Sequence, residues 1–252
     1  GKGGTGKTSL TAGVGTALAL SGKRVLCVDC DIGLRNLDLA LGLTDRALMD
    51  FSDVALNRCS LESAVVSHPN VPNLYLLTAP VRMRGPGVTT LDFRLMLAKI
   101  RQQFDYCLLD APAGLGEGFR LAVCAADRCV VVTTQDASSL RDAQRVVAEL
   151  DWLPQVYLVI NRIQPKLLRK RRTTIDDAMN TAGLPLIGVI PEDAQVMLCA
   201  NRGIPLTSQG RKGAAMACRN IAWRLMGRRI PIMRIRGPRI TPSITIKEVS
   251  PP

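Results

Sequence analysis

The chain opens with residues that have the types and the spacing of a phosphate-binding loop. Gly1-Lys2-Gly3-Gly4-Thr5-Gly6-Lys7-Thr8 matches the pattern G-x-x-x-x-G-K-[ST] in full. Glycines in such a loop let backbone N–H groups turn toward phosphate oxygens, because no Cβ stands in the way. Lys7 supplies a cation for the β- and γ-phosphates, and the Thr8 hydroxyl is a ligand for Mg²⁺. The pattern predicts a nucleotide site made by Gly1, Gly3, Gly4, Thr5, Gly6, Lys7, Thr8 and Ser9.

Lys2 is a second lysine near the start of the loop. A loop that binds one nucleotide within its own subunit does not need this lysine. One interpretation makes it a solvated charge on a loop. The other makes it a catalytic lysine that reaches the nucleotide of a second subunit, as an arginine finger does.

Three aspartates directly follow or end apolar segments. Asp110 ends the segment 106–110, and Asp29 and Asp31 stand at the end of the segment 24–29. The carboxyl ends of parallel strands meet at one edge of a sheet, so we expect all three beside the phosphate loop. Carboxylates at that edge can act on a nucleotide bound by the loop, so Asp31 and Asp110 are candidate site residues. Either could instead cap a helix or hold a turn. Asp29 has two equal interpretations, as part of the Mg²⁺ shell or as a residue that only orients its loop.

The elements that must position these residues alternate along the chain. We predict strands at residues 24–29, 74–77, 106–110, 128–133, 155–160 and 186–190, and helices at 8–21, 89–103, 118–126, 137–150, 173–182 and 212–227. In the helix 89–103, Leu91, Leu95, Leu97 and Ile100 are expected mostly on one face. The alternation predicts an α/β fold, a P-loop NTPase three-layer sandwich with a mostly parallel central sheet. A helix that follows the loop in register disfavours a chance match.

Several motifs together resemble the MinD/ParA ATPases. The first eight residues, with Lys2, resemble the deviant Walker A loop of that family. Residues 29–38 are close to the switch I segment of its MinD branch, and residues 110–114 resemble Walker B and switch II. Residues 133–142, Asn161-Arg162 and residues 190–193 are also similar. The match runs in order from Gly1 to about Leu206, and switch I is its most specific part.

The resemblance implies two ATP-bound subunits that face each other with the nucleotides between them. ATP and Mg²⁺ are then the cofactors, and ATP is hydrolysed slowly to ADP and phosphate by in-line attack of water. Lys2 would act in trans, Lys7 and Thr8 in cis, and Asp31 would position the water. The remaining nucleotide and metal contacts implied are Asp110 through water, the backbone N–H of Gly114, and Asn161, Arg162 and Pro191.

The same resemblance implies a spatial regulator of cell-division site selection. Such a protein is cytoplasmic and peripheral on the inner face of the cell membrane. Its partners would be a second copy of itself, activator and inhibitor proteins of the division-site system, and an acidic membrane surface. The net charge of +12 indicates anionic partners without choosing among them.

Two alternatives stay open within the family. A ParA-like DNA-segregation ATPase is motivated by the net charge and by the basic run Lys166, Arg169, Lys170, Arg171 and Arg172. DNA ranks below the membrane as a partner. A regulator of flagellar placement, similar to FlhG, shares the same loop and is hardly separable by sequence.

The cysteines and the single histidine are not predicted to do chemistry. The 8 cysteines lie mostly in apolar runs and are expected to be buried, reduced thiols. An iron–sulfur carrier on this scaffold would need cysteines such as Cys107 and Cys124 near switch II, but one lies in a predicted strand and the other in an apolar helix. His68 is expected in a polar loop and not as a general base.

We predict a P-loop ATPase domain over residues 1–227 and a basic, proline-containing tail over residues 228–252. With 47% apolar and 4% aromatic residues, the core must consist mostly of Leu, Val, Ile and Ala. A strand normally leads into a P-loop and ends at its first glycine, so we expect that strand to be missing from this sequence.

Overall fold

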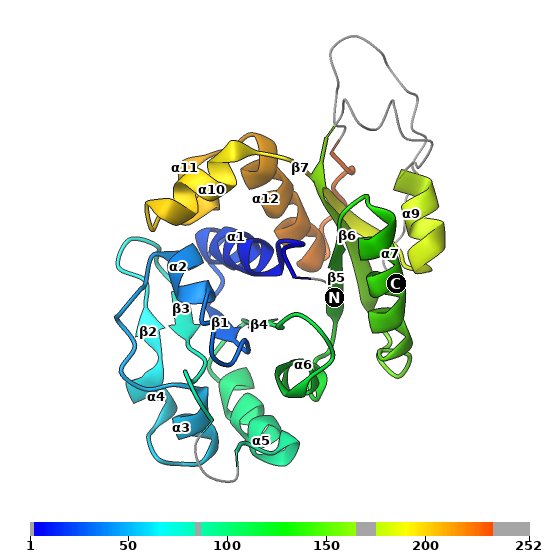
Figure 1. The fold of residues 1–252 in the computed structure, drawn as a ribbon. Helices are drawn as coiled ribbons and strands as arrows, with labels where there is room; N and C mark the ends of the chain where they lie inside the picture. The colour runs from blue at the N-terminus through cyan, green and yellow to red at the C-terminus, as the bar shows by residue number, and fades with distance from the viewer. Residues whose placement is uncertain (1–2, 84–86, 165–174, 234–252) are drawn as a thin grey trace.

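The computed structural model describes residues 3–83, 87–164 and 175–233, in which strands and helices alternate (Figure 1). The strands are β1 (Val25–Asp29), β2 (Val66–Ser67), β3 (Leu74–Leu77), β4 (Tyr106–Asp110), β5 (Cys129–Thr133), β6 (Val156–Ile163) and β7 (Leu186–Pro191). The helices are α1 (Lys7–Leu20), α2 (Leu37–Leu41), α3 (Phe51–Ala55), α4 (Leu61–Ala64), α5 (Thr90–Arg101), α6 (Glu117–Val123), α7 (Ala137–Ala148), α9 (Ile175–Ala182), α10 (Ala194–Asn201), α11 (Leu206–Gln209) and α12 (Gly213–Leu225).

The strands are mostly parallel, as predicted. One sheet has the order β2-β3-β1-β4 and a second has the order β5-β6-β7. Strand β1 pairs in parallel with β3 and β4, and β6 pairs in parallel with β5 and β7, while β2 joins β3 antiparallel. Within the described residues the central sheet is therefore in two pieces, where the sequence predicted one. The loop that enters α1 lies between the two pieces (Figure 1).

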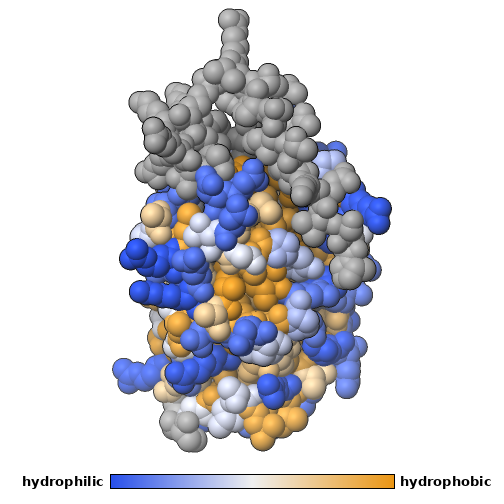
Figure 2. Space-filling view, turned by 90° about the vertical axis from the view of Figure 1, so that its right-hand side faces the viewer, coloured by the Kyte–Doolittle hydropathy of each residue, from blue (hydrophilic) through white to orange (hydrophobic). Residues whose placement is uncertain are grey.

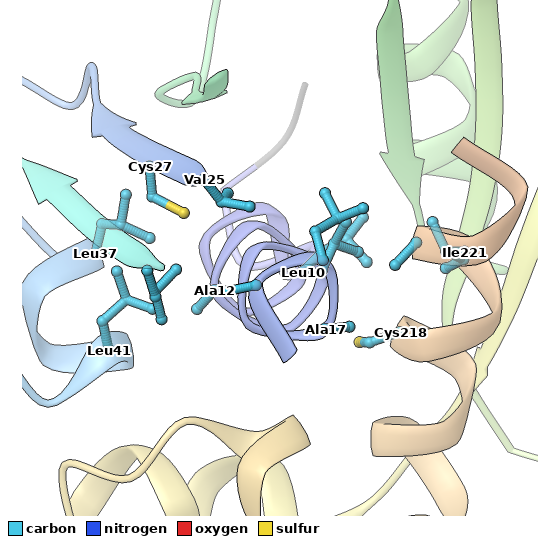
Figure 3. Packing of buried hydrophobic residues seen from close by; sticks show 14 of the residues in the cluster. Leu10, Ala12, Ala17, Val25, Cys27, Leu37, Leu41, Cys218 and Ile221 are labelled. Atoms are coloured by element: carbon cyan, nitrogen blue, oxygen red, sulfur yellow. The ribbon is translucent and has the colours of Figure 1, made fainter. Parts of the chain in front are cut away.

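Helix α1 is the centre of the packing because it is buried on nearly all sides. Its apolar residues share one cluster with β1 and β3, with β7, and with α2 and α12. Figure 3 views α1 nearly end on, with Leu37 and Leu41 of α2 on one side and Cys218 and Ile221 of α12 on the other. A second cluster covers the opposite face of the first sheet beneath α3 and α5, and a third lies between the second sheet and α7 and α9. Helices therefore cover both faces of both sheets, which is the predicted three-layer sandwich.

The third cluster reaches the molecular surface. Val123, Val147 and Met179 pack against it and are only partly buried. Figure 2 views the side of the molecule on which Figure 1 draws α7 and α9, and it shows an apolar area in the middle of a hydrophilic rim.

The buried face of α5 differs from the prediction. Leu91 and Leu95 are 64% and 58% exposed, whereas Phe93, Met96, Leu97 and Ile100 are buried. The face with Leu91 and Leu95 and the buried face lie about half a turn apart around the helix axis. The aromatic side chain of Phe93 determines which of the two is buried. Phe93 meets Phe51 of α3 edge to face, with ring centroids 5.3 Å apart.

His68 lies in the loop between β2 and β3, as predicted, but its side chain is buried. Its Nε2 is 3.0 Å from the carbonyl oxygen of Leu41, and its Nδ1 accepts hydrogen bonds from the N–H groups of Asn70 and Val71. Burial lowers the pKa of the imidazole, so the neutral ring serves as a structural link between α2 and the loop before β3.

Helix α12 closes the domain as predicted, packing on α1 and β7. The chain after it stays attached through Arg224, whose guanidinium donates hydrogen bonds to the carbonyl oxygens of Ile230 and Pro231 and of Ile187 in β7. The rest of the predicted tail, from residue 234, lies outside the described residues, and the division at residue 227 stays a prediction.

Candidate functional site

The glycine-rich loop has the backbone geometry that its sequence predicts. Gly4 and Gly6 adopt φ angles of 77° and 93°, in the left-handed region that favours glycine. A Cβ at Gly6 would lie 2.2 Å from Nδ2 of Asn161, so the position also leaves no room for a side chain. Helix α1 follows at once, with no capping side chain and no acidic residue in its first turn. Its positive end therefore faces the loop, as in an anion site.

Asp110 ends β4 next to the first turn of α1. Its carboxylate is buried, accepts a hydrogen bond from Thr11 Oγ1 at 3.1 Å, and is hydrogen-bonded to the side chain of Thr8. Burial raises the pKa of Asp110 to about 6, and the charge of Asp29 adds to that rise, against the opposing effects of Thr8, Thr11 and Lys7. Thr8 and Asp110, two of the residues predicted to hold the metal ion, are therefore in contact.

Lys7 lies within the electrostatic reach of two carboxylates. Burial lowers the pKa of its ammonium group, while Asp110 and Asp31 act to raise it. Burial likewise raises the pKa of Asp31, and Lys7 partly offsets that effect. The structure therefore brings three of the four predicted catalytic residues together at the ends of β1 and β4. The fourth, Lys2, lies outside the described residues, as does Gly1.

Asp29 holds the switch I segment in place. One carboxylate oxygen accepts from the N–H of Asp31 at 2.8 Å and the other from the N–H of Leu37 at 3.0 Å. The side chain is buried, which raises its pKa in spite of these hydrogen bonds. With both oxygens occupied by backbone donors, this geometry supports the loop-orienting interpretation over a place in the metal shell.

The segment after β4 lies against the phosphate loop. A Cβ at Gly3 would be 4.0 Å from that of Ala113, so the two loops are in van der Waals range. Gly114 follows with φ of 83° in an exposed position with open space around it. The contact of its backbone N–H with a phosphate stays a prediction.

Asn161 braces the phosphate loop, a contact that the sequence did not predict. Its Nδ2 donates to the carbonyl oxygen of Thr5 at 2.8 Å, and its Oδ1 accepts from the N–H of Arg162 at 2.8 Å. Arg162 has a positive φ of 56°, and its guanidinium is 3.4 Å from Glu192. Ile163 pairs with Pro191 across β6 and β7. Asn161, Arg162 and Pro191, three of the predicted nucleotide contacts, thus share one edge of the second sheet.

Thr11 was also missed by sequence reasoning. It stands three residues after Thr8 on α1, and residues at that spacing lie on one helix face, so helical periodicity was the available signal. No comparable local signal predicts the contact between Asn161 and Thr5, because the two residues are far apart in sequence.

The donor set fits a magnesium nucleotide. The Thr8 hydroxyl and the Asp110 carboxylate are hard oxygen ligands of the kind Mg²⁺ binds, usually with waters and substrate phosphates completing its shell. The loop at Gly3 to Gly6 offers backbone to phosphate oxygens, and a Cβ at Gly4 would meet no atom within 4 Å. The predicted basic run at residues 166–172 lies outside the described residues.

The structure combines a doubly wound parallel α/β fold, the glycine-rich loop with its lysine, and a buried carboxylate at the end of β4. Together these features define a P-loop nucleotide-binding protein. The particular family follows from a match over residues 1–206. There the chain matches the model of the CobQ/CobB/MinD/ParA nucleotide binding domain, and it belongs to that family.

Relatives and solved structures narrow the family to its MinD branch. The chain is 37% identical to the septum site-determining protein MinD of Synechocystis, over 92% of this chain and 89% of the relative. It is similar to MinD in the MinC:MinD cell division protein complex of Aquifex aeolicus, with 36% identity, a TM-score of 0.86, and coverage of 92% and 95%. It is also similar to Pyrococcus horikoshii MinD complexed with Mg-ADP, with 28% identity, a TM-score of 0.77, and coverage of 89% and 92%.

These likenesses confirm the predicted family, the P-loop NTPase fold and the class of ATPases. They favour the septum-site interpretation over the DNA-segregation and flagellar alternatives. In the described part of the chain, no helix combines the length and the hydropathy needed to cross a membrane.

Proposed function

We propose that this chain is an ATP-driven switch that takes part in placing the division septum. The observation that carries the proposal is the convergence of Lys7, Asp31 and Asp110 on the glycine-rich loop, at the start of α1. The similarity to MinD proteins over most of the chain supplies the biological setting.

The residues around the loop divide the work between holding phosphates and orienting water. Magnesium, when bound with ATP, neutralises charge on the β- and γ-phosphates. Thr8 and Asp110 would hold the ion, the latter through water, and Lys7 would contact the phosphates. Asp31, only partly buried, can accept a hydrogen bond from a water and so orient it for in-line attack. The backbone N–H of Gly114 would contact the γ-phosphate, which links the segment after β4 to the nucleotide state.

A dimer formed through this face would complete the site, with Lys2 reaching the partner's nucleotide. Apolar side chains support such a contact. Leu34, Val81 and Leu115 follow the carboxyl ends of β1, β3 and β4, and Leu34 and Val81 are 69% and 65% exposed. Exposed apolar residues on loops around a polar site are what a protein interface at that edge would cover.

The proposed partners follow from the MinD relatives. The Aquifex relative is solved in complex with MinC, so we propose an inhibitor protein of that kind, together with an activator of hydrolysis. We also propose a cytoplasmic protein that associates peripherally with the inner face of the cell membrane through acidic lipid. The net charge of +12 is compatible with that surface.

Lys7→Ala and Lys2→Ala separate nucleotide binding from dimer formation. We expect Lys7→Ala to abolish retention of ATP, because the phosphates lose their cation. We expect Lys2→Ala to retain ATP but to stay monomeric with it, as measured by light scattering coupled to gel filtration with and without Mg-ATP. Lys23→Ala, which removes a lysine beyond the far end of α1, is the control and should behave as the unchanged chain.

Normal ATP-dependent dimers of the Lys2 variant would exclude its action in trans. Full ATP retention by the Lys7 variant would overturn the site itself. Cosedimentation with acidic vesicles, compared with retention on duplex DNA at low salt, then tests the membrane proposal against the DNA-segregation alternative.

A further inference from the structure

The last described segment of the chain has charge of one sign only. Between Asp193 and Glu248 the sequence contains no acidic residue. The charged side chains of residues 194–233 are Arg202, Arg211, Lys212, Arg219, Arg224, Arg228 and Arg229. The first of these lies just after α10 and the others lie in or beside α12, so the α10 to α12 side of the domain is strongly basic.

A surface cavity of about 320 Å³ opens in this basic region. It is lined by Leu20, Ser208, Gln209, Gly210, Arg211 and Arg219. Leu20 is the last residue of α1, whereas the glycine-rich loop precedes its first residue. At 1.5 Å per residue the cavity lies about 20 Å along the helix from the phosphate loop. It is therefore a separate site and not an extension of the nucleotide site.

Arg219 is held in the cavity wall with part of its donor capacity unused. It is half-buried, and one terminal nitrogen donates to the carbonyl oxygen of Thr207, which fixes the guanidinium. Its Nε is buried and has no hydrogen-bond partner among the described residues. A buried donor without an acceptor leaves the positive charge of the Arg219 guanidinium less compensated, which favours an anion in the cavity beside it.

Arg211 adds a second positive charge to the same cavity. It is exposed and close enough to Arg219 that its charge, after burial, helps to lower the pKa of Arg219. Among the described residues neither arginine forms an ion pair with a carboxylate. The nearest carboxylate in sequence, Asp193, is occupied by the N–H groups of Gln195 and Ala214. Two unneutralised guanidinium groups in one hollow are an arrangement that favours an anion.

We propose that this cavity is a second anion site, which binds a phosphate ester between Arg211 and Arg219. Planar guanidinium groups match the oxygens of a phosphate, and Ser208 and Gln209 add neutral polar groups to the wall. The volume falls in the range of small-molecule sites, so the site takes the phosphate together with a small attached group. That phosphate belongs either to a free metabolite or to a lipid headgroup at a bilayer surface.

Glycerol 3-phosphate and vesicles of phosphatidylglycerol are the two probes, with phosphatidylcholine vesicles as the neutral reference. All measurements use the full chain carrying Lys7→Ala, so that phosphate bound at the P-loop does not contribute. Into that chain go Arg211→Gln, Arg219→Gln or Arg202→Gln. Arg202 is an exposed residue of the same basic segment outside the cavity, so Arg202→Gln controls for the loss of one charge. Arg211→Gln alters an exposed side chain and keeps the test valid should Arg219→Gln fail to fold.

We expect saturable binding of at least one probe, weakened about tenfold or more by Arg211→Gln and Arg219→Gln and less than twofold by Arg202→Gln. Calorimetric binding of glycerol 3-phosphate would identify a free ester as the source. Binding to phosphatidylglycerol vesicles alone, with the same dependence on the two arginines, would identify a headgroup. Equal losses in all three variants would mean a diffuse electrostatic effect and would overturn the proposal, as would the absence of saturable binding by either probe.

Discussion

The position of Asp110 makes its carboxylate reactive and at the same time destabilises the fold. It ends a buried strand, so its carboxylate loses most of its hydration, and two threonine hydroxyls only partly replace it. The pKa of about 6 records that imbalance. A bound metal ion would supply the missing positive charge, which explains why a buried carboxylate can persist here.

We predict that Asp110→Asn stabilises the nucleotide-free chain at neutral pH while weakening its binding of Mg²⁺. The folded-state pKa is raised from 3.8 to about 6, so the folded protein binds the proton more tightly than the unfolded chain does. Ionisation of Asp110 therefore destabilises the fold. This destabilisation is absent below about pH 4, grows between about pH 4 and 6, and is complete above about pH 6. At pH 7.5 the variant should be more stable by up to about 3 kcal/mol.

Urea unfolding of both chains between pH 4.5 and 8 measures this difference. Asp31→Asn is the matched control, because that carboxylate is less buried and should show a much smaller effect. A stability difference for Asp110→Asn that does not change with pH would contradict the assignment.

Residues defined by local patterns could be predicted, and those defined by long-range contacts could not. Lys7, Thr8 and Asp110 follow from a motif and from a strand end, both of which are local in sequence. The hydrogen bond between Asn161 and Thr5 joins β6 to the glycine-rich loop across most of the chain, and no local pattern near either residue predicts it. The two hydrogen bonds of Asp29 likewise appear only once the loop is folded.

At the scale of elements, α1 packs unusually closely because glycines face its neighbours. A Cβ at Gly15 would lie 2.5 Å from Sγ of Cys27 in β1 and 3.3 Å from Leu108 in β4. A Cβ at Gly13 would lie 2.8 Å from Sγ of Cys218 in α12. Glycine inside a helix is unfavourable by about 0.5–1 kcal/mol relative to alanine, and the close approach of helix and sheet offsets that loss.

We predict that Gly15→Ala destabilises the chain by about 1–3 kcal/mol, since the overpacking outweighs the better helix propensity. Removing the sulfur with Cys27→Ala should recover part of that loss in the double variant, although Leu108 remains close. Chemical denaturation of the four chains gives the interaction free energy between the two positions. Strictly additive effects would show that Cys27 is not what limits the space.

Long elements were predicted well because their apolar periodicity extends over several turns or a whole strand. The short helices α2, α3, α4 and α11 have 4 or 5 residues, too few for a helical period to be visible, and they were missed. Helix α10, with 8 residues, was missed as well. The face of α5 was assigned partly wrongly because Leu91 and Leu95 are as apolar as the residues that are buried. Only the partner, Phe51, decides which face turns inward.

At the scale of the whole molecule, Arg224 joins three parts of the fold. From the last turn of α12 it reaches β7 and the chain at Ile230 and Pro231. Beyond these, Ile232 packs on the third apolar cluster and Met233 on the first. Successive side chains therefore contact different clusters, so the stretch up to Met233 packs against the domain.

We predict that Arg224→Met destabilises the chain by roughly 2–3 kcal/mol and releases residues 228–233, because three carbonyl oxygens lose a charged donor. The stability of Arg224→Lys should lie between that of the unchanged chain and that of Arg224→Met, since an ammonium group cannot reach all three carbonyls as a planar guanidinium does. Urea denaturation gives the stability, and hydrogen exchange of the N–H groups of residues 228–233 gives the release. Arg228→Met, which alters an exposed arginine four residues on, should leave both unchanged. If Arg224→Met lowered stability while exchange in residues 228–233 stayed slow, the attachment would depend on Ile232 and Met233 alone.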